Sequence, residues 1–179
     1  MLGVDFIEGG WPGANPTDSE FFASVPKLNA TMTAFGMTKR DGRSAENDEV
    51  LAAVINAGTT SVCLVGKTYD FHVTKALGIS LPNNIVNISK SIEHIVAKGR
   101  EAIFDAEHFF DGYHANPNYA LDCLHAAYSS GSRWIVLCDT NGGTLPSKIY
   151  QITQEVIKSG IPGSSLGIHC HNDTENAIA

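Results

Sequence analysis

Short apolar runs rich in β-forming residues recur along the chain, and polar residues follow each run. Six runs are visible, at 4–7, 30–35, 61–65, 102–104, 134–138 and 166–170. Segments with helical patterning separate them, so the run ends recur roughly every 27 to 40 residues. Strands that alternate with helices pair in parallel through right-handed crossovers. The pattern therefore predicts an α/β fold with six parallel strands and five complete strand–helix units.

Local start and stop signals place the helices between these strands. Thr-Asp-Ser-Glu at 17–20 has the form of a capping box, and Ser44 is a candidate cap for a helix that stops at Gly58. A shorter helix is expected to begin at Asp70 and to stop at Gly78. Three longer helices, each bounded by proline or glycine, are expected at 85–97, 117–130 and 146–159.

Two architectures accommodate six parallel strands in a chain of 179 residues. A doubly wound open sheet fits this length, whereas a complete (β/α)₈ barrel needs about 250 residues. A doubly wound sheet would gather its polar residues at one switch point, but here they follow nearly every strand, and no G-x-G-x-x-G follows the first strand. We therefore predict a partial TIM barrel, a single catalytic-domain fragment over 1–179 that holds barrel strands two to seven and has two open edges.

The charge balance and composition exclude several classes of protein. Only 12 Lys and Arg residues stand against 19 Asp and Glu residues, and this net charge of −7 leaves no basic face for nucleic acid or acidic membranes. The sequence has no apolar run near the roughly 20 residues of a membrane helix, and residues 1–5 lack the basic start and long apolar stretch of a signal peptide. The four cysteines form no CxxC pair, which indicates reduced thiols, at least three of them in the core. We expect a cytoplasmic protein that acts on small molecules.

Two histidines, His169 and His171, close the last apolar run at a spacing of i, i+2. Side chains alternate between the two faces of a strand, so both imidazoles project to the same side, close enough to bind one divalent metal ion. The alternative is a pair of exposed histidines at a strand end that bind no ligand. A metal enzyme is therefore the first hypothesis.

Asp105 and Glu107 have the same spacing at the end of the fourth run. Like-charge repulsion on a shared face would raise the pKa of one carboxyl group and suit it to acid–base chemistry. Two solvated carboxylates without a catalytic role are the alternative. The tract Gly-Lys-Thr at 66–68 matches the end of a phosphate-binding loop, but Ser61 stands where that loop needs its first glycine, so we reject a phosphate loop here.

Four tracts carry a resemblance to a known family. They are Ile-Glu-Gly-Gly-Trp-Pro-Gly-Ala-Asn-Pro at 7–16, Asp-Ala-Glu-His-Phe-Phe-Asp-Gly-Tyr at 105–113, Cys-Asp-Thr-Asn-Gly-Gly-Thr at 138–144 and His-Cys-His-Asn-Asp at 169–173. Together, in this order, they resemble the acyl-CoA condensing metalloenzymes that include citramalate synthase, 2-isopropylmalate synthase, homocitrate synthase and hydroxymethylglutaryl-CoA lyase. The tracts around Glu107 and Thr140 are most similar to the citramalate synthase branch.

The resemblance implies a Claisen-type condensation of acetyl-CoA with pyruvate, which gives citramalate and free CoA in branched-chain amino-acid biosynthesis. His169 and His171 match the family's two imidazole ligands of a divalent cation, which acts as a Lewis acid on the oxoacid. Imidazole ligands suit Mn²⁺, Mg²⁺ or Zn²⁺ in different members, so the metal stays open. The family resemblance also implies a homodimer for the full-length enzyme.

Other strand ends acquire roles through the same resemblance. Glu107 corresponds to an acidic catalytic residue near the reacting carbons, and Glu8 to an acid that orients a catalytic arginine. Thr140 corresponds to a hydroxyl that contacts the carboxylate of the oxoacid. Asp105 shares the face of Glu107 and is a further candidate for substrate binding.

Pyruvate is small and should occupy a small apolar pocket. Phe35 and Val65 stand at strand ends near the expected site and are the candidate walls of this pocket. The family's first strand, which carries the arginine and an aspartate metal ligand, and its last strand have no counterpart in 1–179. We therefore expect these residues to be a fragment that is inactive by itself.

Two other functions stay open on the sequence. A related synthase or lyase could act on another oxoacid, and a pocket that accepts 2-oxoisovalerate as readily as pyruvate would indicate it. A non-catalytic barrel remnant could associate with other chains through its open sheet edges. Metal binding that disappears when both histidines are replaced would argue against the remnant.

Overall fold

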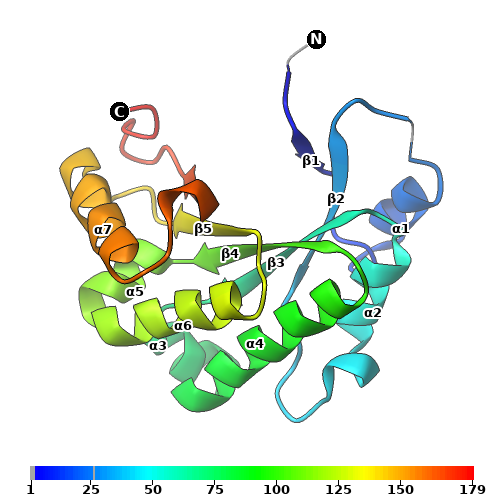
Figure 1. Cartoon of the computed structure of the whole chain (residues 1–179), viewed down its shortest axis with the longest axis horizontal. Helices are drawn as coiled ribbons and strands as arrows, with labels where there is room; N and C mark the ends of the chain where they lie inside the picture. Colours follow the sequence, from blue (N-terminus) through cyan, green and yellow to red (C-terminus); the bar gives the residue numbers. More distant parts are fainter. Residues whose placement is uncertain (1–2, 26) are drawn as a thin grey trace.

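Six parallel strands form one sheet in the computed structural model, which describes residues 3–25 and 27–179. The strands are β1 Phe6–Glu8, β2 Thr31–Met37, β3 Ser61–Lys67, β4 Glu101–Glu107, β5 Trp134–Asp139 and β6 Leu166–Cys170. Their spatial order follows the chain, from β1 at one edge to β6 at the other (Figure 1). A sheet without a reversal of strand order has no switch point, so the doubly wound alternative is wrong. The predicted partial barrel is confirmed as a curled half-barrel of six strands.

Helices connect the strands and cover one face of the sheet. The α-helices are α1 Pro16–Ala23, α2 Glu49–Asn56, α3 Asp70–His72, α4 Leu81–Ala97, α5 Phe109–Ala115, α6 Pro117–Ser129 and α7 Pro146–Lys158. Shorter turns are the 3₁₀ helices η1 Ala45–Asn47 and η3 Gly163–Ser165 and the π-helix η2 Val73–Leu77. Contacts of α4 with β3 and β4, and of α6 with β4 and β5, place these two helices side by side on the sheet (Figure 1). The longer predicted helices are confirmed, although α4 begins earlier than expected, with Ser80 as its cap.

The two faces of each strand have different surroundings, as β4 illustrates. Ala102, Phe104 and Ala106 point to the outer face and belong to the buried core beneath the helices. Asp105 and Glu107 alternate with them, so they point to the inner face, which the helices leave open. The apolar core is therefore one-sided, and the polar strand ends collect on the concave side of the sheet.

The caps of the first two helices differ from the prediction. Asn15, not the predicted Thr-Asp-Ser-Glu tract, caps α1: its side chain accepts a 2.9 Å hydrogen bond from the backbone N–H of Asp18, and Pro16 occupies the first helical position. Asp48, rather than Ser44, caps α2 by accepting from two backbone N–H groups. A carboxylate can satisfy several N–H groups at once, and Ser44 instead precedes the short turn η1.

Helix α5 was missed by the sequence prediction. It directly follows His108, whose backbone is left-handed at a φ of 54°, and no side chain caps it. Gly112, in the middle of α5, lets the helix approach the loop after β3, because a Cβ there would lie 2.5 Å from the carbonyl oxygen of Thr68. Tertiary packing, not helix propensity, holds this element in place.

All four cysteines are free thiols, and three of them, Cys63, Cys123 and Cys138, are buried as expected. Only Cys123 belongs to the apolar core between sheet and helices, whereas Cys63 and Cys138 lie outside it. Across the described part of the chain, no helix combines the length and the apolar character needed to span a membrane.

Candidate functional site

A pocket of about 460 Å³ opens on the concave side of the sheet, at the carboxyl ends of the strands. Every residue predicted for the site lines this pocket: Glu8, Phe35, Val65, Asp105, Glu107, Thr140, His169 and His171. All six strands, or the residues that directly follow them, contribute a side chain. Such a convergence of polar groups at the carboxyl ends of parallel strands is typical of active sites in α/β barrels.

Strand pairing brings these side chains together. In the parallel register, Val65 of β3 stands beside Asp105 of β4, and Cys138 of β5 beside His169 of β6. Residues paired in this way project from the same face of the sheet. One register therefore sets the positions of the carboxylates and the imidazoles relative to one another.

The two histidines project to the same side of the sheet, as predicted. Their rings are stacked with centroids 5.1 Å apart, and the side chain of His169 is 56% exposed. Its Nδ1 lies 3.9 Å from Oδ2 of Asp105. Imidazole nitrogens beside a carboxylate oxygen, open to solvent on one side, are a donor set that suits a divalent cation.

The carboxyl group of Asp105 titrates abnormally, but not for the predicted reason. Burial and, second, the negative charge of Glu8 raise its pKa from 3.8 to about 6, after Cys63 and His169 have partly offset the shift. Repulsion from Glu107 was the expected cause, and that expectation is wrong. The ammonium group of Lys67 forms an ion pair with Glu107, which neutralises its charge beside Asp105.

Thr140 follows β5 and connects to the segment after β4. Its hydroxyl oxygen accepts a 2.9 Å hydrogen bond from the backbone N–H of His108. A hydroxyl that accepts one bond still carries an O–H that can donate, so Thr140 can offer a hydrogen bond to an anion in the pocket. The bond also ties the loop after β4 to the loop after β5, the two loops beside Glu107.

All residues of this site lie within a sequence region that matches a known protein family. Residues 1–179 match the family model described as HMGL-like. The chain belongs to the HMGL-like family. Enzymes of this family generally depend on a divalent cation, which agrees with the imidazole and carboxylate donors in the pocket of this HMGL-like chain.

Several curated relatives of the HMGL-like chain are synthases. It is 48% identical over 188 residues to an (R)-citramalate synthase of Synechocystis sp. and 48% identical over 181 residues to an (R)-citramalate synthase of Aquifex aeolicus. A 2-isopropylmalate synthase of Caulobacter vibrioides is 28% identical over 181 residues. These alignments cover 99 to 100% of the chain but only 33 to 34% of each relative. The chain thus spans about a third of the length of the curated relatives it matches.

Solved structures of HMG-CoA lyases share the fold of this HMGL-like chain. The hydroxymethylglutaryl-CoA lyase of Pseudomonas aeruginosa superposes with a TM-score of 0.79 at 17% identity, covering 99% of this chain and 59% of the lyase. The HMG-CoA lyase of Brucella melitensis gives a TM-score of 0.78 at 16% identity, covering 98% and 62%. The likeness supports the barrel architecture of the six strands.

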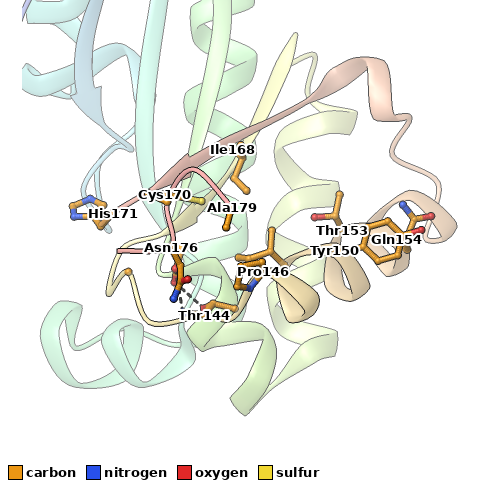
Figure 2. Close-up of a pocket in the computed structure, with 14 residues that line it drawn as sticks. Thr144, Pro146, Tyr150, Thr153, Gln154, Ile168, Cys170, His171, Asn176 and Ala179 are labelled. Atoms are coloured by element: carbon orange, nitrogen blue, oxygen red, sulfur yellow. Dashed lines mark hydrogen bonds between the residues drawn. The ribbon is translucent and has the colours of Figure 1, made fainter. Parts of the chain in front are cut away.

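A second pocket of the HMGL-like chain, of about 390 Å³, lies between α7 and the segment after β6 (Figure 2). Cys170 and Ile168 face it, whereas His169, between them on β6, faces the inner pocket. The alternation of side chains along one strand therefore separates the two pockets. His171, beyond the end of β6, lines both of them.

The sequence analysis did not predict a role in the site for four residues. Gly10, Trp11 and Cys138 line the inner pocket, and Lys67 contacts Glu107 at its rim. The ring of Trp11 packs edge-to-face on Phe35, with centroids 5.7 Å apart, and forms one wall. The rejection of a phosphate loop at 66–68 was correct, because Lys67 is the last residue of β3. The i, i+2 spacing of Val65 and Lys67 was the signal that could have placed this lysine on the inner face.

Proposed function

We propose that the full-length protein catalyses the condensation of acetyl-CoA with pyruvate to give citramalate and CoA. The convergence of all eight predicted site residues on one pocket carries this proposal. The 42 to 48% identity to proteins named (R)-citramalate synthase supports this choice of substrates over those of 2-isopropylmalate synthase. We further propose that the protein is a cytoplasmic homodimer that contributes to branched-chain amino-acid biosynthesis.

His169 and His171 are the proposed ligands of a divalent cation, either Mn²⁺, Mg²⁺ or Zn²⁺. When bound, the cation would polarise the keto group of pyruvate and stabilise the alkoxide that forms on attack. Both histidines are exposed and line the pocket, which supports this role. The acetyl methyl group loses a proton, its carbon bonds to the keto carbon, and water then cleaves the thioester to release CoA.

Glu107 is the proposed acid–base residue of this sequence. Its carboxylate faces the pocket at the end of β4, and its ion pair with Lys67 holds it in position. Thr140 donates a hydrogen bond to the carboxylate of the oxoacid, and Asp105, which lines the same pocket, is a further proposed substrate-binding residue. The proposed role of Glu8 is to orient a catalytic arginine of the full-length protein.

Phe35 and Val65 are the proposed walls around the methyl group of pyruvate. Both line the pocket, and the ring of Trp11, which also lines it, packs edge-to-face on Phe35. One extra methylene group in a tight apolar pocket changes discrimination by about 10- to 200-fold. We expect Val65→Ala to raise the relative rate with 2-oxoisovalerate by at least about 10-fold.

The test is an assay of CoA thiol release by the full-length protein with acetyl-CoA, pyruvate and Mn²⁺ or Mg²⁺. Glu107→Gln should lower the rate by at least about 100-fold, because a positioned acid–base group contributes about 10² to 10⁴. Glu101→Gln is the matched control, since Glu101 lies exposed at the opposite end of the same strand. Equal rates for both variants, or no preference for pyruvate over 2-oxoisovalerate, would contradict the proposal.

A further inference from the structure

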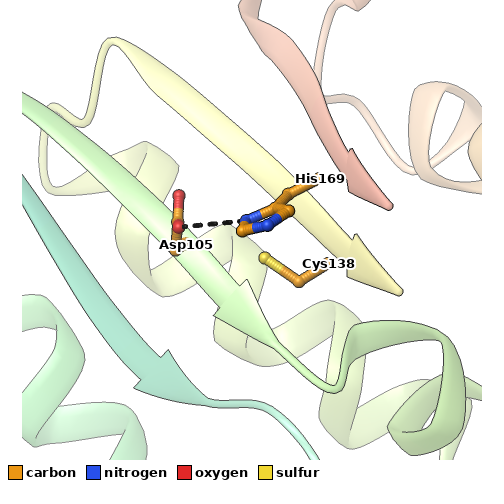
Figure 3. Close-up of side chains that lie close together, drawn as sticks. All are labelled: Asp105, Cys138 and His169. Atoms are coloured by element: carbon orange, nitrogen blue, oxygen red, sulfur yellow. Dashed lines mark ion pairs between the residues drawn. The ribbon is translucent and has the colours of Figure 1, made fainter. Parts of the chain in front are cut away.

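Three side chains from neighbouring strands form a compact group below the rim of the inner pocket. A carboxylate oxygen of Asp105 on β4, Sγ of Cys138 on β5 and a ring nitrogen of His169 on β6 all lie within 4.8 Å of one another. Figure 3 shows the three side chains pointing toward one another across adjacent strands. Each group is a potential metal ligand of a different chemical type.

The separation of these atoms is close to that of ligands around one cation. Bond lengths of about 2.0 to 2.3 Å in a tetrahedral zinc site imply about 3.4 Å between neighbouring ligand atoms. Nδ1 of His169 lies 3.9 Å from Oδ2 of Asp105, only about half an ångström wider than this value.

The donor set favours thiophilic cations. Thiolate ligands select zinc and similar ions, whereas Mg²⁺ and Mn²⁺ prefer oxygen ligands. We propose that Asp105, Cys138 and His169 form a thiolate-containing site for a thiophilic divalent cation such as Zn²⁺, distinct from the His169/His171 pair. On binding, the Cys138 thiol transfers its proton to solvent and its sulfur bonds to the cation.

The site is preorganised and accessible. Asp105 and Cys138 are 9% and 5% exposed and stand on paired strands, so their positions are held by the sheet. The Cys138 thiol makes a long sulfur contact of 3.7 Å to the carbonyl oxygen of Val136. Burial and the nearby carboxylates of Asp105 and Glu107 raise the pKa of this thiol, so the bound cation itself has to displace its proton. His169 is exposed on the pocket side and leaves an open direction for a cation and its remaining water ligands.

Occupancy of this inner site has a consequence that rests on the proposed function. A neutral imidazole donates one lone pair to a metal ion, so His169 can serve the inner site or the His169/His171 pair, but not both at once. A thiophilic cation in the inner site would therefore compete with the cation that the condensation requires. Inhibition by Zn²⁺ that excess Mn²⁺ relieves is the expected result of this competition.

Cobalt tests the inner site without any measurement of activity, because Co²⁺ reports sulfur ligation by a charge-transfer band in the near ultraviolet. We expect metal-free full-length protein to develop this band on titration with Co²⁺ and to lose it when Zn²⁺ displaces cobalt. Cys138→Ser should abolish the band, and Cys138→Ala is a second variant in case serine perturbs the fold. Asp105→Asn should weaken cobalt binding by at least about 10-fold, because the loss of a group that only hydrogen-bonds to a metal ligand already weakens metal binding by about 10- to 100-fold.

Two variants are controls that should keep the band. Cys170→Ser removes a thiol on the opposite face of β6, and His171→Ala removes a ligand of the other proposed site only. A band that persists without Cys138, or one that needs Cys170, would overturn the inner site. Cobalt bound without any sulfur band would also overturn it and would leave the proposed condensing function untouched.

Discussion

The ammonium group of Lys67 forms an ion pair with the carboxylate of Glu107 across the neighbouring strands β3 and β4. The two residues are paired in the sheet register, and their side chains are only 24% and 25% exposed. A partly buried carboxylate has lost part of its hydration, and its ion-pair partner offsets that loss. Without the partner, the unpaired charge destabilises the folded state. This pair is therefore expected to matter both for folding and for the proposed catalytic carboxylate.

Replacing Lys67 by methionine should destabilise the protein by about 1 to 3 kcal/mol, because it leaves Glu107 as an unpaired, partly buried charge. It should also lower the rate of CoA release, while Lys67→Arg retains most of it. Urea unfolding and the CoA assay measure the two effects. Lys90→Met is the control, since Lys90 pairs with Glu93 at 2.7 Å on the exposed side of α4 and should matter little. Equal losses in both variants would argue against a special role for the inner pair.

Asp105 should make the metal-free protein less stable as the pH rises from about 4 to about 6. Its pKa is raised from 3.8 in the unfolded chain to about 6 in the folded protein. Between these pH values the folded state holds more of this proton than the unfolded chain, so the free energy of unfolding falls as the pH rises. A shift of about two pKa units corresponds to about 3 kcal/mol. Asp105→Asn removes this dependence, and the variant should be the more stable protein above pH 6. Unfolding in EDTA at several pH values tests this, and parallel curves for both proteins would contradict it.

Asp48→Ala should destabilise the protein by about 1 to 2 kcal/mol through loss of a helix cap. Its buried carboxylate accepts hydrogen bonds from the backbone N–H groups of Arg40, Val50 and Leu51. Ser44→Ala is the matched control, because the Ser44 side chain makes no cap bond. Thermal unfolding compares the two, and a larger effect at Ser44 would restore the cap predicted from the sequence.

Gly112→Ala should destabilise the protein by about 1 to 3 kcal/mol, the usual effect of overpacking. An added Cβ would lie 2.5 Å from the carbonyl oxygen of Thr68 and 2.9 Å from Cα of Tyr69, and neither backbone atom can move freely. Gly143→Ala is the control, because a Cβ there meets nothing within 4 Å. Similar unfolding midpoints for both variants would show that α5 does not depend on this close approach.

Much of the fold was predictable because the strands and longer helices carry local signals. Buried parallel strands are continuous apolar runs, and helix ends such as Gly78 and Asn116 have distinctive residues. Helix α5 lacked such signals, since it follows a left-handed His108 and contains Gly112. The cap of α2 was misplaced because Ser44 and Asp48 are equally good candidates in sequence, and only the path of the chain after β2 decides between them.

Which side chains share a face of the sheet could be predicted from residue spacing alone. His169 with His171, and Asp105 with Glu107, are two residues apart at strand ends, and the backbone geometry of a strand predicts that such pairs lie on one side. Which residues meet across strands became visible only in the folded sheet. Lys67 rather than Asp105 became the electrostatic partner of Glu107, and Asp105 came to lie beside Cys138 and His169. These contacts depend on the register and curvature of the sheet. Both arise from packing along the whole half-barrel, so no short sequence pattern predicts them.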